Sequence, residues 1–170
     1  MKVLGIAGFS GSGKTTLIEK IIPELVRAGL RVSLIKHAHH EFDVDQPGKD
    51  SYRHRMAGCT EVLVSSDRRW ALMHELRGAP EPSLQEQLKH FGPCDLVLVE
   101  GYKNDPIPKI EVHRREVQAP LLYPQDSNVI AIATDEPLDT ALPQFTLDDI
   151  SGIAGFAMHH LGLDRARLVR

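Results

Sequence analysis

The chain has 170 residues, of which 42% are hydrophobic and 25% charged, and its formal net charge is -3. This composition excludes a disordered or fibrous protein, and the lack of a basic excess argues against nucleic acid and membrane surfaces as partners. No apolar run approaches the roughly 20 residues that cross a bilayer. Two cysteines, Cys59 and Cys94, lack metal-ligand spacing. We therefore expect a single domain over residues 1–170, located in the reducing cytoplasm.

The first elements of the chain predict a βαβ unit. Residues 3–7 are a short apolar run that is typical of a buried strand, and they lead into a glycine-rich turn. Apolar residues then recur at helical spacing over residues 17–26, with Gly29 as the stop. Pro23 lies inside this pattern and predicts a kink or a broken hydrogen bond. Residues 31–36 are a second strand, so the two strands belong to a parallel sheet.

The middle of the chain predicts a polar loop and a short helix. Residues 37–48 are rich in His, Asp and Glu, which indicates a loop. Residues 49–57 predict a helix that Asp50 or Ser51 caps. Further elements are predicted at residues 83–90 (helix), 96–99, 110–113 and 129–133 (strands) and 147–161 (closing helix).

The most specific motif lies between the first strand and the first helix. Residues 8–15, GFSGSGKT, match the pattern G-x-x-x-x-G-K-[ST] in full. Glycines let successive backbone N–H groups turn toward a phosphate chain, and the helix that follows adds its positive end. The predicted nucleotide-binding residues are Ser10, Gly11, Ser12, Gly13, Lys14, Thr15 and Thr16. The fold class is therefore an α/β P-loop NTPase, with a mostly parallel sheet flanked by helices.

A nucleotide bound with Mg²⁺ also needs a carboxylate at the end of a neighbouring strand. Glu100 ends the apolar run 96–99 and is the predicted partner of the metal, together with the hydroxyl of Thr15. Lys14 is expected to reach the β- and γ-phosphates and is the first catalytic candidate. The second is Asp45, in the polar loop that follows the second strand.

The same loop carries three histidines, His37, His39 and His40, which leave two interpretations open. One is a polar loop near the phosphates, and the other is a transition-metal site. Basic clusters at residues 53–55 and 68–69 are likewise either solvated surface or a site for a second phosphorylated ligand or partner.

Base recognition is expected after the strand 129–133. Thr134 and Asp135 follow that strand, and an Asp there is suited to accept hydrogen bonds from guanine. The Asn-Lys-x-Asp tetrad of G proteins does not occur, so the identity of the base does not follow from the residues alone.

Taken together, the motifs resemble those of the MobB family, the molybdopterin-guanine dinucleotide biosynthesis accessory proteins. The segments that carry the likeness are residues 8–16, 36–39 with 45–51, 100–103 and 108–112. The resemblance implies a homodimeric protein that binds GTP and Mg²⁺ and hydrolyses GTP weakly. It also implies that the chain assists the MobA-type guanylyltransferase that attaches GMP to molybdopterin, with molybdopterin-bearing proteins as further partners. Two alternatives are a P-loop small-molecule kinase and a GTPase that delivers a metal.

An antiparallel hairpin is predicted as an excursion from the parallel sheet. Residues 61–66 and 69–76 are β-like runs separated by a two-residue turn. We expect one apolar hairpin face that pairs across a dimer axis, because such a face is poorly suited to water. Its residues are Val62, Val64, Trp70, Leu72 and Leu76.

Overall fold

The structure is a computed structural model that describes residues 1–38 and 42–164. Contacts within the chain divide it into two compact units, Met1–His37 with Leu88–Arg170 and Ala38–Gln87. The interpretation of residues 1–170 as one domain stays a prediction. None of the helices formed by the described residues has the length and apolar composition that a membrane span requires.

The first unit is built on a parallel sheet, as the βαβ pattern predicts. Its strands lie in the order β2-β5-β1-β6-β7-β8, and every neighbouring pair is parallel. Their bounds are β1 Lys2–Ala7, β2 Val32–Lys36, β5 Leu96–Glu100, β6 Lys109–His113, β7 Val129–Thr134 and β8 Gln144–Thr146. The α/β fold with a mostly parallel sheet is therefore confirmed.

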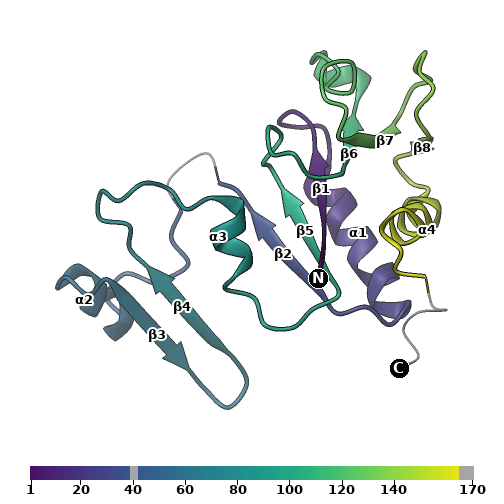
Figure 1. The fold of residues 1–170 in the computed structure, drawn as a ribbon. Coiled ribbons are helices and arrows are strands. Elements are labelled where there is room, and N and C mark those ends of the chain that lie inside the picture. Colours follow the sequence, from purple (N-terminus) through teal and green to yellow (C-terminus); the bar gives the residue numbers. More distant parts are fainter. Residues whose placement is uncertain (39–41, 165–170) are drawn as a thin grey trace. The chain divides into compact units, whose positions relative to one another are not determined.

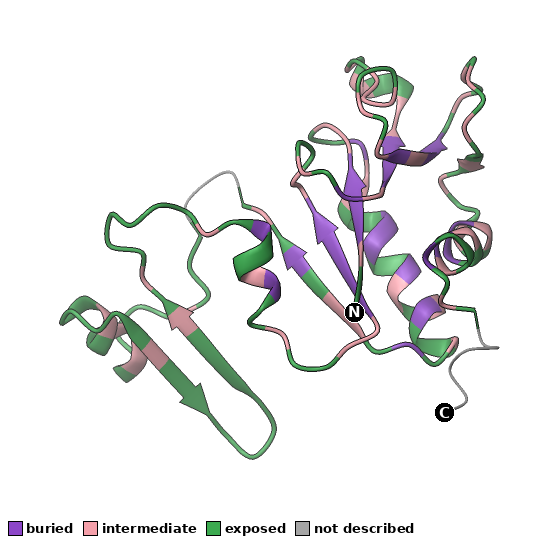
Figure 2. Ribbon diagram, in the orientation of Figure 1, coloured by how far each residue is buried: buried purple, intermediate pink, exposed green. Residues whose placement is uncertain are grey.

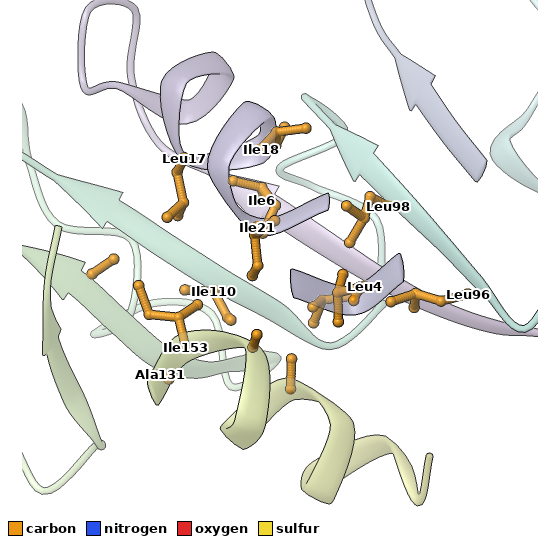
Figure 3. Packing of buried hydrophobic residues seen from close by; sticks show 14 of the residues in the cluster. Leu4, Ile6, Leu17, Ile18, Ile21, Leu96, Leu98, Ile110, Ala131 and Ile153 are labelled. Carbon is orange, nitrogen blue, oxygen red and sulfur yellow. The ribbon is translucent and has the colours of Figure 1, made fainter. Parts of the chain in front are cut away.

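Two helices cover one face of this sheet (Figure 1). They are α1, Lys14–Arg27, and α4, Ile150–Leu161. Pro23 lies inside α1, which continues through it as one helix. In Figure 3 the side chains of α1 meet those of β1, β5 and β6 in one aliphatic cluster. The cluster includes Leu4, Ile6, Leu17, Ile18, Ile21, Leu96, Leu98, Ile110 and Ile153, all nearly fully buried.

Two buried charged side chains of β6 hold loops to the sheet. The Lys109 ammonium donates to the carbonyl oxygens of Lys103 and Asp105, at 2.8 Å each, and to the Asp126 carboxylate at 2.6 Å. Burial raises the pKa of Asp126, but the hydrogen bonds from Lys109 and Asn128 outweigh it and leave that pKa below its usual value. The buried Glu111 carboxylate accepts two backbone N–H groups of the loop after the 3-10 turn η1, Arg115–Val117. Both loops are thus tied to the sheet by hydrogen bonds to ionic groups.

The second unit contains a short helix and the hairpin. The elements are α2 Asp50–Met56, β3 Glu61–Ser65 and β4 Trp70–His74, and α3, Leu84–Leu88, spans the boundary with the first unit. The predicted hairpin is present, and much of it is exposed (Figure 2). The predicted cap of α2 is wrong: Lys49 occupies the cap position and no side chain caps the helix. Ser51 instead donates to the Asp45 carboxylate at 2.8 Å.

The predicted composition of the hairpin face is also wrong. Val62 and Val64 are paired with Met73 and Ala71, whereas Leu72 is paired with Leu63 and Trp70 with Ser65. Directly paired residues of an antiparallel ladder lie on the same face, and successive pairs alternate between faces. The two valines therefore lie on the opposite face from Trp70 and Leu72. Leu63, which the sequence analysis left out, joins the face of Trp70 and Leu72.

Candidate phosphate-binding site

The parallel sheet brings most of the predicted site residues to one edge. The loop of residues 8–13 follows β1, Lys36 and Glu100 end β2 and β5, and Thr134 ends β7. The carboxyl ends of parallel strands meet at the same edge, which is where open α/β sheets bind ligands. The glycine loop therefore leaves the sheet at the same edge as Lys36 and Glu100, and β5, which carries Glu100, is the direct neighbour of β1.

The glycine loop has the backbone conformation that its sequence predicts. Gly8, Gly11 and Gly13 have φ angles of 146°, 82° and 96°, a region that favours glycine. Helix α1 begins directly after Gly13 and carries no acidic residue in its first turn. No carboxylate of the helix itself therefore offsets its positive end, which suits a phosphate group. The Ser12 hydroxyl in the loop is buried and has no hydrogen-bond partner, a second feature that fits a polar ligand.

Lys14 lies over the glycine loop, with its ammonium donating to the Phe9 carbonyl oxygen at 2.8 Å. Burial lowers the pKa of Lys14, Glu100 opposes this effect, and Lys36 and Lys103 lower that pKa further. Lys36 and Lys103 thus act on Lys14 as like charges, and the Glu100 carboxylate acts on it as an opposite charge. An added polyanion would relieve the repulsion between these lysines, so the local charge fits a phosphate chain.

Thr15 and Glu100 form the contact on which the predicted metal site depends. The Thr15 hydroxyl donates to the Glu100 carboxylate at 2.8 Å, although 85 residues separate them in sequence. Glu100 is only 7% exposed, and the Lys36 ammonium lies 3.5 Å from its other oxygen. A hydroxyl and a carboxylate are the hard oxygen ligands that Mg²⁺ prefers, so this pair fits the ion.

An arginine that the sequence analysis did not single out also contacts the loop. Arg114 follows β6, and its Nε donates to the Ser12 carbonyl oxygen at 3.2 Å. The available signal was its position, directly after the strand that neighbours β1. Sequence separation hides this contact, because the two partners are 102 positions apart.

The residues predicted to read the base are held by neighbours after β7. The Thr134 hydroxyl donates to the Glu136 carbonyl oxygen at 3.1 Å and accepts the Glu136 N–H. The Asp135 carboxylate accepts the backbone N–H of Arg115 at 3.0 Å. These bonds order the segment, and base recognition by Thr134 and Asp135 stays a prediction.

Asp45 belongs to the second unit, where it is part of an ionic cluster. Its carboxylate accepts the Ser51 hydroxyl and lies 3.3 Å from the Arg55 guanidinium. Arg55 also pairs with Asp43 and Glu75, at 2.6 Å each, and its hydrogen bond is the main cause that lowers the pKa of Asp43. Arg55 is therefore an internal partner rather than solvated surface. The catalytic role of Asp45 stays a prediction.

The histidine-rich loop falls partly outside the described residues, which leave out residues 39–41 and with them His39 and His40. Within residues 1–38 and 42–164, no group of three or more His, Cys, Asp or Glu side chains is arranged to hold a metal ion. His37 packs edge-on against the ring of Tyr102, with ring centroids 5.1 Å apart.

The family profile and two relatives that are more than 40% identical to this chain point to the same family. The profile of the family described as "Molybdopterin guanine dinucleotide synthesis protein B" (MobB) matches residues 3–135. The chain is 48% identical over 165 residues to the molybdopterin-guanine dinucleotide biosynthesis adapter protein of Haemophilus influenzae, covering 93% of this chain and 90% of the relative. It is 43% identical to the adapter protein of the same description from Escherichia coli, covering 92% and 91% of the two chains.

A solved structure shows the same architecture. The crystal structure of a MobB homolog from Bacillus stearothermophilus matches with a TM-score of 0.74 and 30% sequence identity. The match covers 96% of this chain and 99% of the homolog. The likeness therefore extends over both units and not only over the glycine loop.

Proposed function

Because this chain belongs to the MobB family of molybdopterin-guanine dinucleotide synthesis proteins, we propose that it is the GTP-binding member of a pair of proteins. Its partner in this proposal is the MobA-type guanylyltransferase that attaches GMP to molybdopterin. A role as an adapter in molybdopterin-guanine dinucleotide biosynthesis agrees with the names of relatives that are 48% and 43% identical. GTP binding, slow hydrolysis and the choice of partner are the further steps of the proposal.

The contact between Thr15 and Glu100 carries the nucleotide part of the proposal. It joins the first turn of α1, directly after the glycine loop, to the end of β5, and the two oxygens are 2.8 Å apart. A Mg²⁺ ion bound there with GTP would supply positive charge to the phosphates. Lys14 and the N–H groups of the loop would bind the phosphate oxygens from the other side. The same positive groups, the Mg²⁺ ion, Lys14 and the N–H groups of the loop, would support the transfer of a phosphoryl group to water.

Slow hydrolysis is the second part of the proposal. Catalysis of phosphoryl transfer requires both neutralised phosphates and a positioned water molecule. Lys14 would meet the first requirement, because its ammonium lies over the glycine loop, bonded to the Phe9 carbonyl oxygen. Of the carboxylates near the loop, Glu100 already accepts the Thr15 hydroxyl and pairs with Lys36. We therefore propose that hydrolysis is slow in the isolated protein and that the partner completes the site.

A reconstituted reaction tests the proposal. The parent protein is combined with the guanylyltransferase, with molybdopterin and with limiting concentrations of Mg²⁺ and GTP. The formation of the guanine dinucleotide is then followed over time. We expect the parent to raise the rate at which the guanine dinucleotide forms, and we expect Lys14→Ala to leave this rate unchanged. Lys20→Ala is the matched control, because Lys20 lies on the same helix in an exposed pair with Asp148.

The outcomes separate the two parts of the proposal. A parent protein that leaves the rate unchanged would contradict the adapter role in this reaction. Equal stimulation by the parent and by Lys14→Ala would contradict the use of bound GTP in that role.

A further inference from the structure

Arg114 directly follows β6, and its side chain contacts the backbone of the glycine loop. Strand β6 lies directly beside β1, so the residues that follow the two strands leave the sheet side by side. The Arg114 Nε donates to the Ser12 carbonyl oxygen at 3.2 Å. A Cβ atom built on Gly13 would lie 3.2 Å from the same Nε. The guanidinium therefore lies against the peptide that joins Ser12 to Gly13.

The orientation of that peptide gives the contact a chemical consequence. In a glycine loop of this type the N–H groups turn toward the phosphates. The Ser12 carbonyl and the Gly13 N–H belong to one planar peptide and point in opposite directions. A cation bound to the carbonyl oxygen polarises the peptide, so the N–H on the other side becomes a stronger donor. Arginine suits this role because its charge is permanent and its donors are fixed in a plane.

The segment that carries Arg114 is held in place at both ends. Val117 of η1 lies 3.8 Å from the Cβ position of Gly11, and the Val112 carbonyl lies against Gly8. On the far side, the Arg115 N–H donates to the Asp135 carboxylate. Residues 112–117 therefore support the glycine loop at several points, which keeps the Arg114 side chain in position although it is 33% exposed.

We propose that Arg114 is a positioning residue for the phosphate chain of a nucleoside di- or triphosphate. Its guanidinium adds a fixed positive charge behind the glycine loop and strengthens the Gly13 N–H as a donor to phosphate oxygen. The proposal rests on the proposed function, because it takes the ligand of the loop to be a guanine nucleotide. It assigns the residue a role in affinity and no direct contact with the reacting atoms.

Two substitutions separate the charge from the hydrogen bond. Arg114→Gln removes the charge and keeps an N–H donor, whereas Arg114→Lys keeps the charge. Affinity for GDP and for a non-hydrolysable GTP analogue, each with Mg²⁺, is measured by calorimetry at low and at physiological salt. We expect Arg114→Gln to bind both about tenfold more weakly, because the positive charge behind the glycine loop is lost. Arg114→Lys recovers most of the affinity.

Salt dependence and a control variant complete the experiment. The affinity of the parent should fall more steeply with salt than that of Arg114→Gln, because one cation fewer acts on the phosphates. Arg27→Gln makes the same charge change at the exposed far end of α1 and should bind like the parent. Thermal unfolding identifies folded variants, and Arg114→Met replaces Arg114→Gln in the comparison if the latter does not fold.

The results separate the role of Arg114 from the proposed function of the protein. Binding by Arg114→Gln within about twofold of the parent would overturn the role of Arg114. Arg114→Lys as weak as Arg114→Gln would also overturn it, because the charge would then have no effect. A parent protein that binds neither nucleotide would overturn the proposed function instead.

Discussion

Gly8 is the residue at which β1 turns into the glycine loop, and two independent features require a glycine there. Its φ angle of 146° is one that other residues rarely adopt. A Cβ atom would also meet the carbonyl oxygen of Val112 on the neighbouring strand and lie 2.8 Å from the Ser12 hydroxyl. The close approach of β1 and β6 at this point therefore depends on a missing side chain.

Gly8→Ala is expected to destabilise the protein by at least about 2 kcal/mol, because backbone strain and a clash with a main-chain oxygen add together. Urea denaturation gives the free energy of unfolding. Gly92→Ala is the matched control, because a Cβ at Gly92 meets nothing within 4 Å and its φ is not positive. Equal stabilities of the two variants would show that β6 can move away from Gly8 at little cost.

Among single residues, the sequence predicts a binding role for those that lie next to one another in the chain and for those that lie at the end of a predicted strand. The glycine loop is consecutive in sequence, and Glu100 is identified by its position at the end of an apolar strand. Arg114 and Ser12 are far apart in sequence, and only the order of the strands brings them together. Asp45 shows the opposite case, since its acidic character alone does not reveal that Ser51 and Arg55 bind it.

Among the elements, β5 is preceded by a carboxylate, Asp95, that ties the start of this strand to the segment before β2. The Asp95 carboxylate accepts the backbone N–H of Arg31 at 2.7 Å and its Nε at 3.3 Å. The backbone N–H, and then the side chain, hold the pKa of Asp95 below its usual value of 3.8. The ionised form therefore stabilises the native state above that value, and this contribution is lost as pH falls through the lowered pKa.

Asp95→Asn is expected to lower the free energy of unfolding by about 1 kcal/mol at neutral pH, since the charged acceptor is lost. The difference between parent and variant should stay constant down to about pH 5 and shrink below about pH 4. Urea denaturation across this pH range measures it. Asp139→Asn, at an exposed aspartate of the same unit, is the control. A difference that grows toward acid would have the wrong sign for this account.

Elements with long apolar patterns are predictable, and short or irregular ones are not. Helix α1 and strands β1, β5 and β7 follow from runs of buried aliphatic residues. Strand β8 has only three residues, with one partly buried, so it carries no recognisable alternation. The hairpin was predictable from its turn, but its register was not. A different pairing of the two strands changes which apolar residues share a face.

For the molecule as a whole, the proposed homodimer gives the hairpin face a partner. Leu63, Trp70 and Leu72 share one face of the β3-β4 hairpin and are exposed. Helix α2 contacts β3, and Arg55 of α2 pairs with Glu75, which directly follows β4. An apolar face of this kind favours pairing with a second copy across a two-fold axis.

Leu72→Glu is expected to convert the dimer into a monomer, because it introduces a charge into the apolar face. Val64→Glu is the matched control: Val64 is 45% exposed and Leu72 is 42% exposed, but the register places Val64 on the opposite face. Sedimentation velocity gives the mass of each variant. A dimer that survives Leu72→Glu, or one that Val64→Glu dissociates equally, would contradict this interface.

The most direct test of the whole account is calorimetric titration of the parent and of Lys14→Ala with non-hydrolysable GTP and ATP analogues in Mg²⁺. We expect the parent to bind the GTP analogue in preference to the ATP analogue, and Lys14→Ala to remain folded and lose tight binding of both. A preference for ATP would contradict the proposed role in guanine dinucleotide synthesis. Unchanged binding by Lys14→Ala would contradict the assignment of the glycine loop as the phosphate site.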